Sequence, residues 1–437
     1  MKTEQQYQQY MYSYPHKTAY GTLQDVDLRD YVEALSEGEN SLYFHIPFCQ
    51  YKCGYCNLFS VTGQSQDTMS AYVAAMRRQA EQLSEIIPEG VEFTDLTLGG
   101  GTPLILPEPL LNRIFGIAEQ YFSFNLKKYP VVAETSPNQT TEEKLALLKE
   151  KGVTRVSIGV QSFQPEELSV LHRHHTAETA RKALQRIKET GFDCMNMDII
   201  YGIPGQTADS LRDSLRQALE YEPEELFVYP LYVKPETALY RQGVKQSEIT
   251  PSLYECARDF LREEGYQQHS MRRFVKAGDG GGDRLPASLC GFGNTISVGC
   301  GGRSYIGRLH FCTPYAVRQE HCLSIIKSYM EQENYRRVTH GCILSWEEQK
   351  RRYVIKHILF GRGIDRLDYR RHFGAEAQAD FPMLQEWEQA GCITIGEEFL
   401  SLTEKGFALS DYLGPQLISP EVRRRSENFY KGLSTIS

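Results

Sequence analysis

The sequence predicts an α/β fold built around a parallel sheet. Six segments with the alternating pattern of a strand lie between residues 41 and 240, and helical patterns separate them. Glycines and polar residues also gather where these strands end, as in the run Gly99-Gly100-Gly101-Thr102-Pro103. Strands that alternate with helices indicate a parallel sheet with right-handed crossovers. The pattern alone leaves two forms open, a curved partial barrel and an open doubly wound sheet.

The first strand begins at Ser41, and the other five are expected at 91–98, 130–134, 153–160, 192–201 and 226–233. The helix after the first strand has one apolar face, made by Tyr72, Met76, Leu83 and Ile87. The pattern Thr140-x-x-Glu143 predicts a capping box for the helix after the third strand, which ends at Gly152. The next helix turns Ala180, Ala183, Leu184 and Ile187 inward and ends at Gly191. Thr207 caps the following helix, which carries Leu211, Leu215 and Leu219 on one side.

Three further segments surround this core. Residues 1–40 are polar and tyrosine-rich, which is typical either of an arm against the core or of a mobile tail. Residues 241–335 are irregular and glycine-rich, including Gly280-Gly281-Gly282, and are expected to complete the core. Residues 336–437 return to helical patterns, with a β-hairpin expected at 392–402. We therefore expect domains at 41–240 and 336–437, joined by the extension and preceded by the arm.

Composition excludes several classes of partner. The formal charge of −8 and the pI near 5.9 give no electrostatic basis for a nucleic-acid partner. The polar start shows no signal region, and no apolar run has the length of a membrane span. Eleven cysteines, an odd number without a paired pattern, do not indicate a disulfide framework. These features predict a cytoplasmic protein with no membrane partner.

The stretch SLYFHIPFCQYKCGYCNLF contains Cys49, Cys53 and Cys56 in a C-x3-C-x2-C spacing. Three thiolates on one short loop suit a [4Fe–4S] cluster, whose irons take cysteine ligands. Such a cluster has four irons, so one would lack a protein ligand and remain open to a small molecule. The alternative is a zinc site, in which His45 would join the three cysteines.

This spacing, with Tyr55 before the third cysteine, resembles the signature of radical S-adenosylmethionine (SAM) enzymes. The flanking HIPFC resembles the oxygen-independent coproporphyrinogen III oxidase-like group, of which this chain looks like an uncharacterised branch. The resemblance covers roughly 41–240 and implies a radical SAM (β/α)6 partial TIM barrel. It also implies a small C-terminal helical, winged-helix-like domain. That domain would act as a cover or, less in keeping with the acidic charge, bind DNA.

The resemblance further implies a cofactor site at the carboxyl ends of the strands. The three cysteines would hold the cluster, and SAM would bind its open iron through the methionine amine and carboxylate. Gly100, Gly101 and Thr102 would offer backbone groups to SAM, where glycine allows close approach. Arg173 would pair with the methionine carboxylate. The remaining residues predicted at the cofactor are Tyr43, Glu134, Gln161, Asp198 and Tyr232.

Two features depart from the oxidases of this group. Those enzymes carry a further cysteine two positions after the third, and this chain has Leu58 there. The stretch SVGCGGRSYIGRLHF also differs, so a distinct substrate is expected. Four arginines are candidates either for binding substrate carboxylates or for surface solvation: Arg272, Arg273, Arg303 and Arg308. Four evenly spaced cysteines suggest either an auxiliary cluster or buried apolar thiols: Cys290, Cys300, Cys312 and Cys322.

The resemblance implies a radical SAM oxidoreductase. SAM would be cleaved to a 5′-deoxyadenosyl radical, which abstracts hydrogen from a small-molecule substrate such as a tetrapyrrole or another carboxylated ring. The electron would come from a donor such as flavodoxin or ferredoxin. Two alternatives stay open: a C-methyltransferase that uses a second SAM, and a haem-binding chaperone without turnover.

Overall fold

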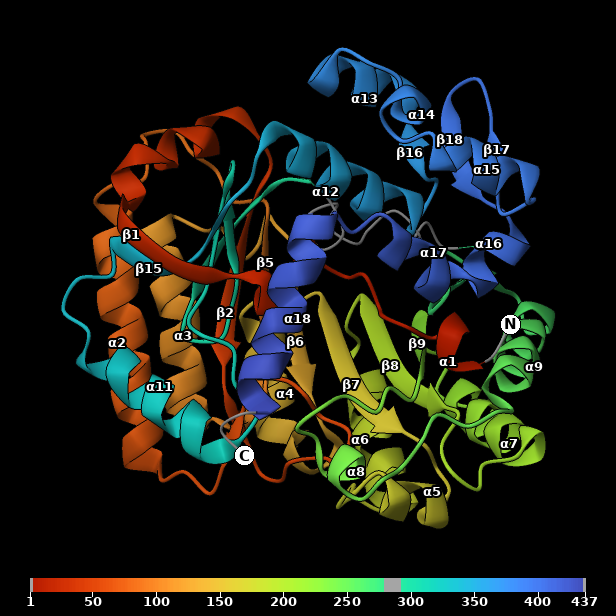
Figure 1. The fold of residues 1–437 in the computed structure, drawn as a ribbon. Coiled ribbons are helices and arrows are strands. Elements are labelled where there is room, and N and C mark those ends of the chain that lie inside the picture. Colours follow the sequence, from red (N-terminus) through yellow and green to blue (C-terminus); the bar gives the residue numbers. More distant parts are fainter. Residues whose placement is uncertain (1–2, 279–291, 435–437) are drawn as a thin grey trace.

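The computed structural model describes residues 3–278 and 292–434, and six parallel strands form its centre (Figure 1). These strands pair in chain order, β2-β5-β6-β7-β8-β9. Their bounds are β2 (Asn40–Ile46), β5 (Asp95–Gly100), β6 (Val131–Thr135), β7 (Arg155–Gln161), β8 (Cys194–Tyr201) and β9 (Glu225–Pro230). All six predicted strands are present, and every neighbouring pair is parallel. The predicted parallel core is therefore confirmed.

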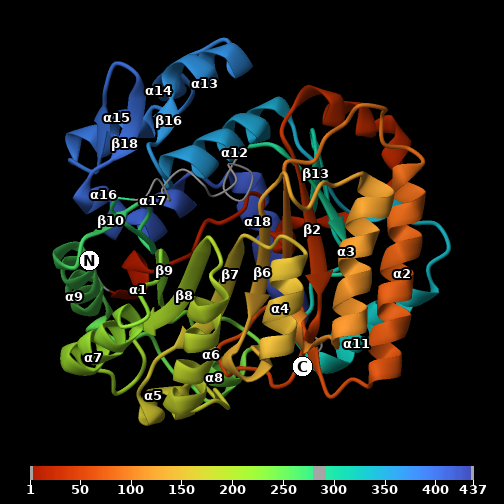
Figure 2. The same cartoon turned by 180° about the vertical axis from the view of Figure 1, so that it is seen from behind.

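Helices cover the outer face of these strands, as Figure 2 shows from behind. They are α2 (Gln66–Ser84), α3 (Glu108–Phe122), α4 (Glu142–Glu150), α5 (Pro165–Val170), α6 (Ala177–Thr190) and α7 (Ala208–Leu219). The predicted apolar face of α2 is buried at Tyr72, Met76 and Leu83, whereas Ile87 lies beyond the end of the helix and is partly buried. Burial of such faces is the main stabilisation of a layered α/β core.

Most predicted helix ends are confirmed. Gly191 ends α6 in a left-handed conformation, and Thr207 caps α7 through a reciprocal pair of hydrogen bonds with Ser210. The capping box at Thr140 is wrong by one residue, because the side chain of Thr141 accepts the hydrogen bond from the Lys144 amide. The Thr140 hydroxyl donates instead to the Ser136 carbonyl, at 2.9 Å.

The segment 241–335 is more regular than predicted. It contains α9 (Thr250–Glu263), β10 (Tyr266–Gln268), β11 (Arg273–Lys276), β12 (Asn294–Val298), β13 (Ser304–Ile306), β14 (Leu309–Phe311) and α11 (Gln319–Glu331), after a short α8 (Ala238–Arg241). Strand β11 pairs antiparallel with β9, and β12 pairs parallel with β2. The segment therefore widens the sheet at both edges, and β1 and β15 from outside the segment complete its 13 strands. The Gly280-Gly281-Gly282 run lies outside the described residues.

The N-terminal segment is an arm packed against the rest of the chain. It holds α1 (Thr3–Gln6) and β1 (Gly21–Asp27), and β1 pairs antiparallel with β15 (Arg337–Ile343). Tyr7 packs in the main core, whereas Met11 and Tyr14 pack in the core of the C-terminal region. In Figure 1 the arm, in red, passes between the barrel strands and the blue C-terminal helices. Of the two interpretations of residues 1–40, the packed arm is the one formed.

The C-terminal region has a hydrophobic core of its own. Its elements are α12 (Trp346–Ile358), β16 (Ile364–Asp365), α13 (Arg366–Phe373), α14 (Ala377–Asp380), α15 (Met383–Gln389), β17 (Ile393–Ile395), β18 (Phe399–Leu402), α16 (Glu404–Ala408), α17 (Ser410–Gln416) and α18 (Pro420–Ser434). The predicted hairpin at 392–402 is confirmed as β17 and β18, and β16 completes a small three-stranded sheet. Among the described helices, none combines the length and hydropathy needed to cross a bilayer.

Candidate functional site

The three-cysteine loop lies where the barrel strands end. It leaves the short strand β3 (Phe48–Cys49), which pairs with β4 (Val61–Thr62) on the far side of the loop. The Gly54 amide donates to the Leu171 carbonyl at 2.9 Å, and the Leu239 amide donates to the Gly54 carbonyl at 2.9 Å. These bonds fix the middle of the loop to two segments that follow other barrel strands.

The glycine run after β5 packs directly against the first cysteine. The Gly101 and Thr102 amides donate to the carbonyls of Ile46 and Phe48, each at 2.8 Å. A Cβ atom at residue 101 would lie 2.8 Å from Cys49 Sγ and 2.6 Å from the Phe48 carbonyl oxygen. Glycine is therefore required here by close approach. The Thr102 hydroxyl lies 3.7 Å from the same Sγ, as a donor to it.

The chemistry of the loop fits a cationic metal cluster. Burial raises the pKa of the Cys49 thiol to about 12, and the nearby Cys56 adds to this. Burial also raises the pKa of Cys56, with Cys53 contributing. Cysteine binds metals as the thiolate. Metal cations bound to these sulfurs would therefore stabilise the deprotonated form that burial disfavours.

Arg173 reaches the cysteine loop. Its Nη1 donates to Cys53 Sγ at 3.2 Å, and its Nη2 donates to the Gly159 carbonyl at the end of β7. The sequence placed Arg173 at the methionine carboxylate of SAM. The structure places it beside a thiol of the predicted cluster, which is compatible with a ligand that binds the cluster.

Glu134, at the end of β6, faces the same glycine run. One carboxylate oxygen accepts from the Gly100 amide at 3.2 Å. Burial raises the pKa of Glu134 to about 7, and the negative charge of Asp198 contributes. The hydroxyl of Tyr43 lies 3.3 Å from His45 Nδ1, and both rings border the glycines of this run. The structure thus brings Tyr43, Gly100 and Glu134 together on one wall.

Gln161 and Asp198 lie on the two neighbouring strands. Gln161 ends β7 with a positive φ of 75°, at an irregularity in the pairing with β8. Its side-chain nitrogen borders Gly159, which is also the residue that Arg173 contacts. Asp198 accepts from Asn196 Nδ2 at 2.9 Å, and burial raises its pKa to about 6. Asp198 is opposite Gly159 in the pairing of β7 with β8, so both residues adjoin Gly159.

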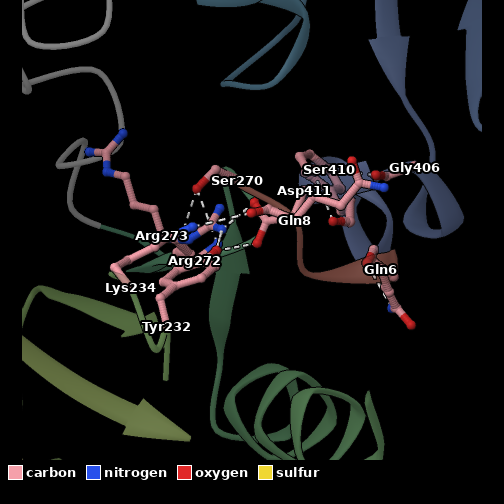
Figure 3. A network of polar contacts seen from close by, with 12 residues as sticks. Gln6, Gln8, Tyr232, Lys234, Ser270, Arg272, Arg273, Gly406, Ser410 and Asp411 are labelled. Carbon is pink, nitrogen blue, oxygen red and sulfur yellow. Dashed lines mark hydrogen bonds and ion pairs between the residues drawn. The ribbon is translucent and has the colours of Figure 1, made fainter. Parts of the chain in front are cut away.

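Tyr232 is the exception among the predicted cofactor residues. Its hydroxyl donates to Asp411 on α17 and accepts from Arg272, in a buried network that joins the barrel to the C-terminal region (Figure 3). The hydroxyl already has a donor and an acceptor there, so in this conformation it is not offered to SAM. The sequence carried no signal of this pairing with a residue far along the chain.

The four arginine candidates have different surroundings, and only some of them are paired with carboxylates. Arg272 and Arg273 form ion pairs with Asp411 and Glu225. Arg308 is exposed and donates to the Leu344 carbonyl at 2.7 Å. Among the four, Arg303 alone lines the cavity described below.

The structure does not form the predicted Cys3His zinc alternative. His45 is buried, and its Nε2 lies 3.2 Å from the Phe59 carbonyl while its Nδ1 faces the Tyr43 hydroxyl. Within residues 3–278 and 292–434, no three His, Cys, Asp or Glu side chains converge closely enough to hold a single metal ion. For the auxiliary-cluster hypothesis, Cys290 lies outside the described residues. Cys300 and Cys322 pack in the main core, and Cys312 packs in a separate small cluster.

A cavity of about 330 Å³ adjoins the wall of Tyr43, Gly100 and Glu134. The arm contributes Tyr12, Ser13, Tyr14 and Lys17 to its lining. Leu58, which stands where related oxidases are expected to carry a cysteine, also lines it and is 44% exposed. The remaining lining residues that bear on function are His45, Asp95, Thr97, Arg303, Tyr305, Arg352 and Lys356. The cavity therefore connects the predicted cofactor wall with the arm and the C-terminal region.

Comparison with known proteins identifies the core. Residues 43–218, which contain the three cysteines and strands β5 to β8, match the family described as the radical SAM superfamily. This chain contains a radical SAM domain. Proteins of this superfamily use a [4Fe–4S] cluster and SAM, and these are the cofactors of this chain.

The relatives of this chain have names of two kinds, heme chaperone and coproporphyrinogen III oxidase. The heme chaperone HemW of Bacillus subtilis is 28% identical over 85% of this chain and 97% of its own length. The oxygen-independent coproporphyrinogen III oxidase of Escherichia coli is 27% identical over 91% of each chain. The solved structure of the E. coli coproporphyrinogen III oxidase (HemN) has a TM-score of 0.79 at 23% identity, covering 93% of this chain and 96% of that one. That likeness confirms the predicted fold class.

Proposed function

We propose that this protein is a radical SAM enzyme that abstracts hydrogen from a carboxylated ring, of which a tetrapyrrole is the leading candidate. The observation that carries the proposal is the continuity of the site. The cysteine loop contacts the glycine run, the glycine run contacts Glu134, and the cavity begins at the same wall. A cluster-bound cofactor and a substrate in the cavity would therefore be neighbours, as hydrogen abstraction requires.

In this proposal Cys49, Cys53 and Cys56 would hold the cluster, and SAM would bind beside it. When bound and reduced, the pair supplies a 5′-deoxyadenosyl radical, while the protein supplies position and shielding. Arg173 holds charge beside Cys53, and the amides and hydroxyl of the 100–102 run bind the methionine end. Glu134, Gln161 and Asp198 bind the rest of SAM. A donor such as flavodoxin or ferredoxin provides the electron.

The names of the relatives support a tetrapyrrole, because one group is named for coproporphyrinogen and the other for heme. The size of the cavity, about 330 Å³, matches a ligand pocket for a compact organic molecule or part of a larger ring. Leu58 places an apolar side chain where the oxidases are expected to have a fourth cysteine. This difference supports a substrate or outcome distinct from that of the oxidases.

A second candidate function is haem binding without turnover. It is favoured by the similarity to heme chaperone HemW over 97% of that protein's length. The two functions differ in whether SAM is consumed, so one assay separates them.

The experiment is anaerobic reconstitution with iron and sulfide, followed by addition of SAM and dithionite. Formation of 5′-deoxyadenosine supports the enzyme, and its increase on addition of coproporphyrinogen III or another reduced porphyrin supports the substrate class. Stoichiometric haem binding without 5′-deoxyadenosine would favour the chaperone. The Cys53→Ala variant is the control, since it should form none.

A further inference from the structure

Besides Lys356, three cations line the cavity, of which Lys17 and Arg352 are buried and Arg303 is partly buried. Lys17 comes from the arm, Arg303 from the turn between β12 and β13, and Arg352 from α12. The exposed fraction is 7% for Lys17 and 4% for Arg352. These segments are far apart in sequence, so the fold brings three positive charges to one place.

Each cation is held by neutral groups. The Lys17 ammonium lies 4.4 Å from the centre of the Tyr315 ring. Arg303 donates to the Ser13 hydroxyl and lies 4.7 Å from the Tyr12 ring. Arg352 donates to the carbonyls of residues 292 and 293, at 2.7 and 3.0 Å. In the part of the chain that the structure describes, none of the three forms a salt bridge with a carboxylate.

Three other arginines that the protein largely encloses are paired with carboxylates. Arg272 meets Asp411, and Arg155 and Arg273 share Glu225. This is the usual arrangement, because a buried charge is costly unless an opposite charge compensates it. In this respect the three cations at the cavity differ from Arg155, Arg272 and Arg273.

The electrostatics agree with this geometry. Burial lowers the pKa of Lys17 to about 8, and the charge of Arg303 lowers it further. Burial lowers the pKa of Arg352 to about 10. The two carboxylates that also line the cavity belong to barrel strands: Asp95 accepts from the Ser41 hydroxyl at 2.8 Å, and Glu134 accepts from the Gly100 amide. An anion bound among the cations would relieve their mutual repulsion and raise the pKa of Lys17 and Arg352 again.

We infer that Lys17, Arg303 and Arg352 form an anion-recognition site that binds carboxylates of the substrate and determines its specificity. The guanidinium groups suit carboxylates, since a planar fork can donate to two oxygens. The identity of the anion rests on the proposed function, whereas the existence of the site rests on the three cations. Because Lys17 and the Tyr12–Arg303 contact belong to the arm, the bound anion also holds the arm against the cavity.

The test measures equilibrium binding to the anaerobically reconstituted full chain, with SAM present and no reductant. The probes are coproporphyrin III, which has four carboxylates, and its tetramethyl ester, which has the same ring without charge. We expect the acid to bind at least about tenfold more tightly than the ester. Lys17→Met, Arg303→Met and Arg352→Met should each weaken binding of the acid by about tenfold or more and leave the ester unchanged.

Arg308→Met is the matched control, because Arg308 follows β13 whereas Arg303 precedes it, and Arg308 is exposed and outside the cavity lining. It should bind both probes like the unmodified chain, and Arg303→Lys should recover part of the affinity. Arg352 supports two backbone carbonyls, so Lys17→Met and Arg303→Met decide the question if Arg352→Met fails to fold. Unchanged affinity for the acid in these two variants, with an unchanged melting temperature, would overturn the inference. Since no turnover is needed, a chain that binds the acid selectively but never forms 5′-deoxyadenosine would refute the proposed function alone.

Discussion

The hydroxyl of Tyr232 donates a hydrogen bond to Oδ2 of Asp411, although 179 residues separate the two along the chain (Figure 3). The other carboxylate oxygen of Asp411 pairs with Arg272, whose guanidinium also lies 3.9 Å from the ring of Tyr10 in the arm. The barrel, the arm and the C-terminal region therefore meet at one buried ion pair. This arrangement ties the segments that enclose the cavity to one another.

The Asp411→Ala variant should be strongly destabilised, because it leaves Arg272 buried without a counter-ion. Breaking a buried pair by removing one partner costs about 3–5 kcal/mol. The free energy of unfolding can be measured in urea by tryptophan fluorescence, since both tryptophans lie in the C-terminal region. Glu81→Ala is the control: its pair with Arg77 is about half exposed, so the loss should be at most about 1 kcal/mol. Equal losses in the two variants would contradict the role of the Asp411 pair.

Replacing Cys49, Cys53 or Cys56 by alanine should remove the iron of the reconstituted protein. The unmodified chain should hold about four irons, as expected for one [4Fe–4S] cluster. Iron and sulfide analysis, with the visible absorption of the cluster, measures the difference. Cys256→Ala is the control, because Cys256 is also partly exposed but lies on α9 and donates weakly to the Ala208 carbonyl. An unmodified chain that never acquires iron, or a triple variant that retains it, would refute the assignment.

Much of the barrel could be predicted from the sequence because its signals are local. Alternating apolar residues indicate strands, and residues such as Thr207 and Gly191 mark helix ends within a few positions. The cysteine spacing and the glycine run are short motifs as well. Their convergence followed from one rule, that the carboxyl ends of parallel strands share one edge of the barrel.

The features that the sequence did not reveal depend on distant pairing. Strand β12 lies beside β2, with Asn294 opposite Asn40. A local sequence pattern does not predict pairing between strands so far apart along the chain. Lys17 lies in a segment of polar composition, and a lysine in such a segment is ordinarily exposed to solvent. Lys17 is buried because segments distant in sequence pack against this part of the arm: its ammonium lies 4.4 Å from the centre of the Tyr315 ring, and the neighbouring Thr18 hydroxyl bonds to Ser426 on α18 at 3.2 Å. Tyr232 illustrates the same limit, since its partner Asp411 lies 179 residues further along the chain.

The Glu134→Gln variant should be more stable than the unmodified chain at alkaline pH and yet bind SAM more weakly. The folded-state pKa of Glu134 is raised from 4.5 to about 7 by burial and by Asp198. Between these values the folded state keeps a proton that the unfolded chain has lost, so stability falls as the pH rises through this window. Glutamine removes that loss and still accepts from the Gly100 amide. It lacks, however, the negative charge proposed to bind SAM.

Thermal unfolding of the SAM-free protein tests this prediction. The melting temperature of Glu134→Gln should exceed that of the unmodified chain above about pH 7 and converge with it toward about pH 4.5. SAM affinity, measured by calorimetry without reductant, should fall in the variant. Asp198→Asn should show the same direction of stability change, because burial raises the pKa of Asp198 to about 6. A variant less stable than the unmodified chain at alkaline pH would contradict the prediction.

The Gly101→Ala variant should fold but fail to assemble the cluster. The added Cβ would lie 2.8 Å from Cys49 Sγ and 2.6 Å from the Phe48 carbonyl oxygen, so the sulfur or the backbone of β3 must move. Cluster ligands tolerate little displacement, and we expect most of the iron and all of the 5′-deoxyadenosine formation to be lost. Gly116→Ala is the matched control, because Gly116 lies in α3 with no atom within 4 Å of its added Cβ. That change should keep the iron and raise helix stability by about 0.5–1 kcal/mol. If Gly101→Ala retained its iron, the contact between the glycine run and Cys49 would not position the cluster, and the continuity on which the proposed function rests would be broken.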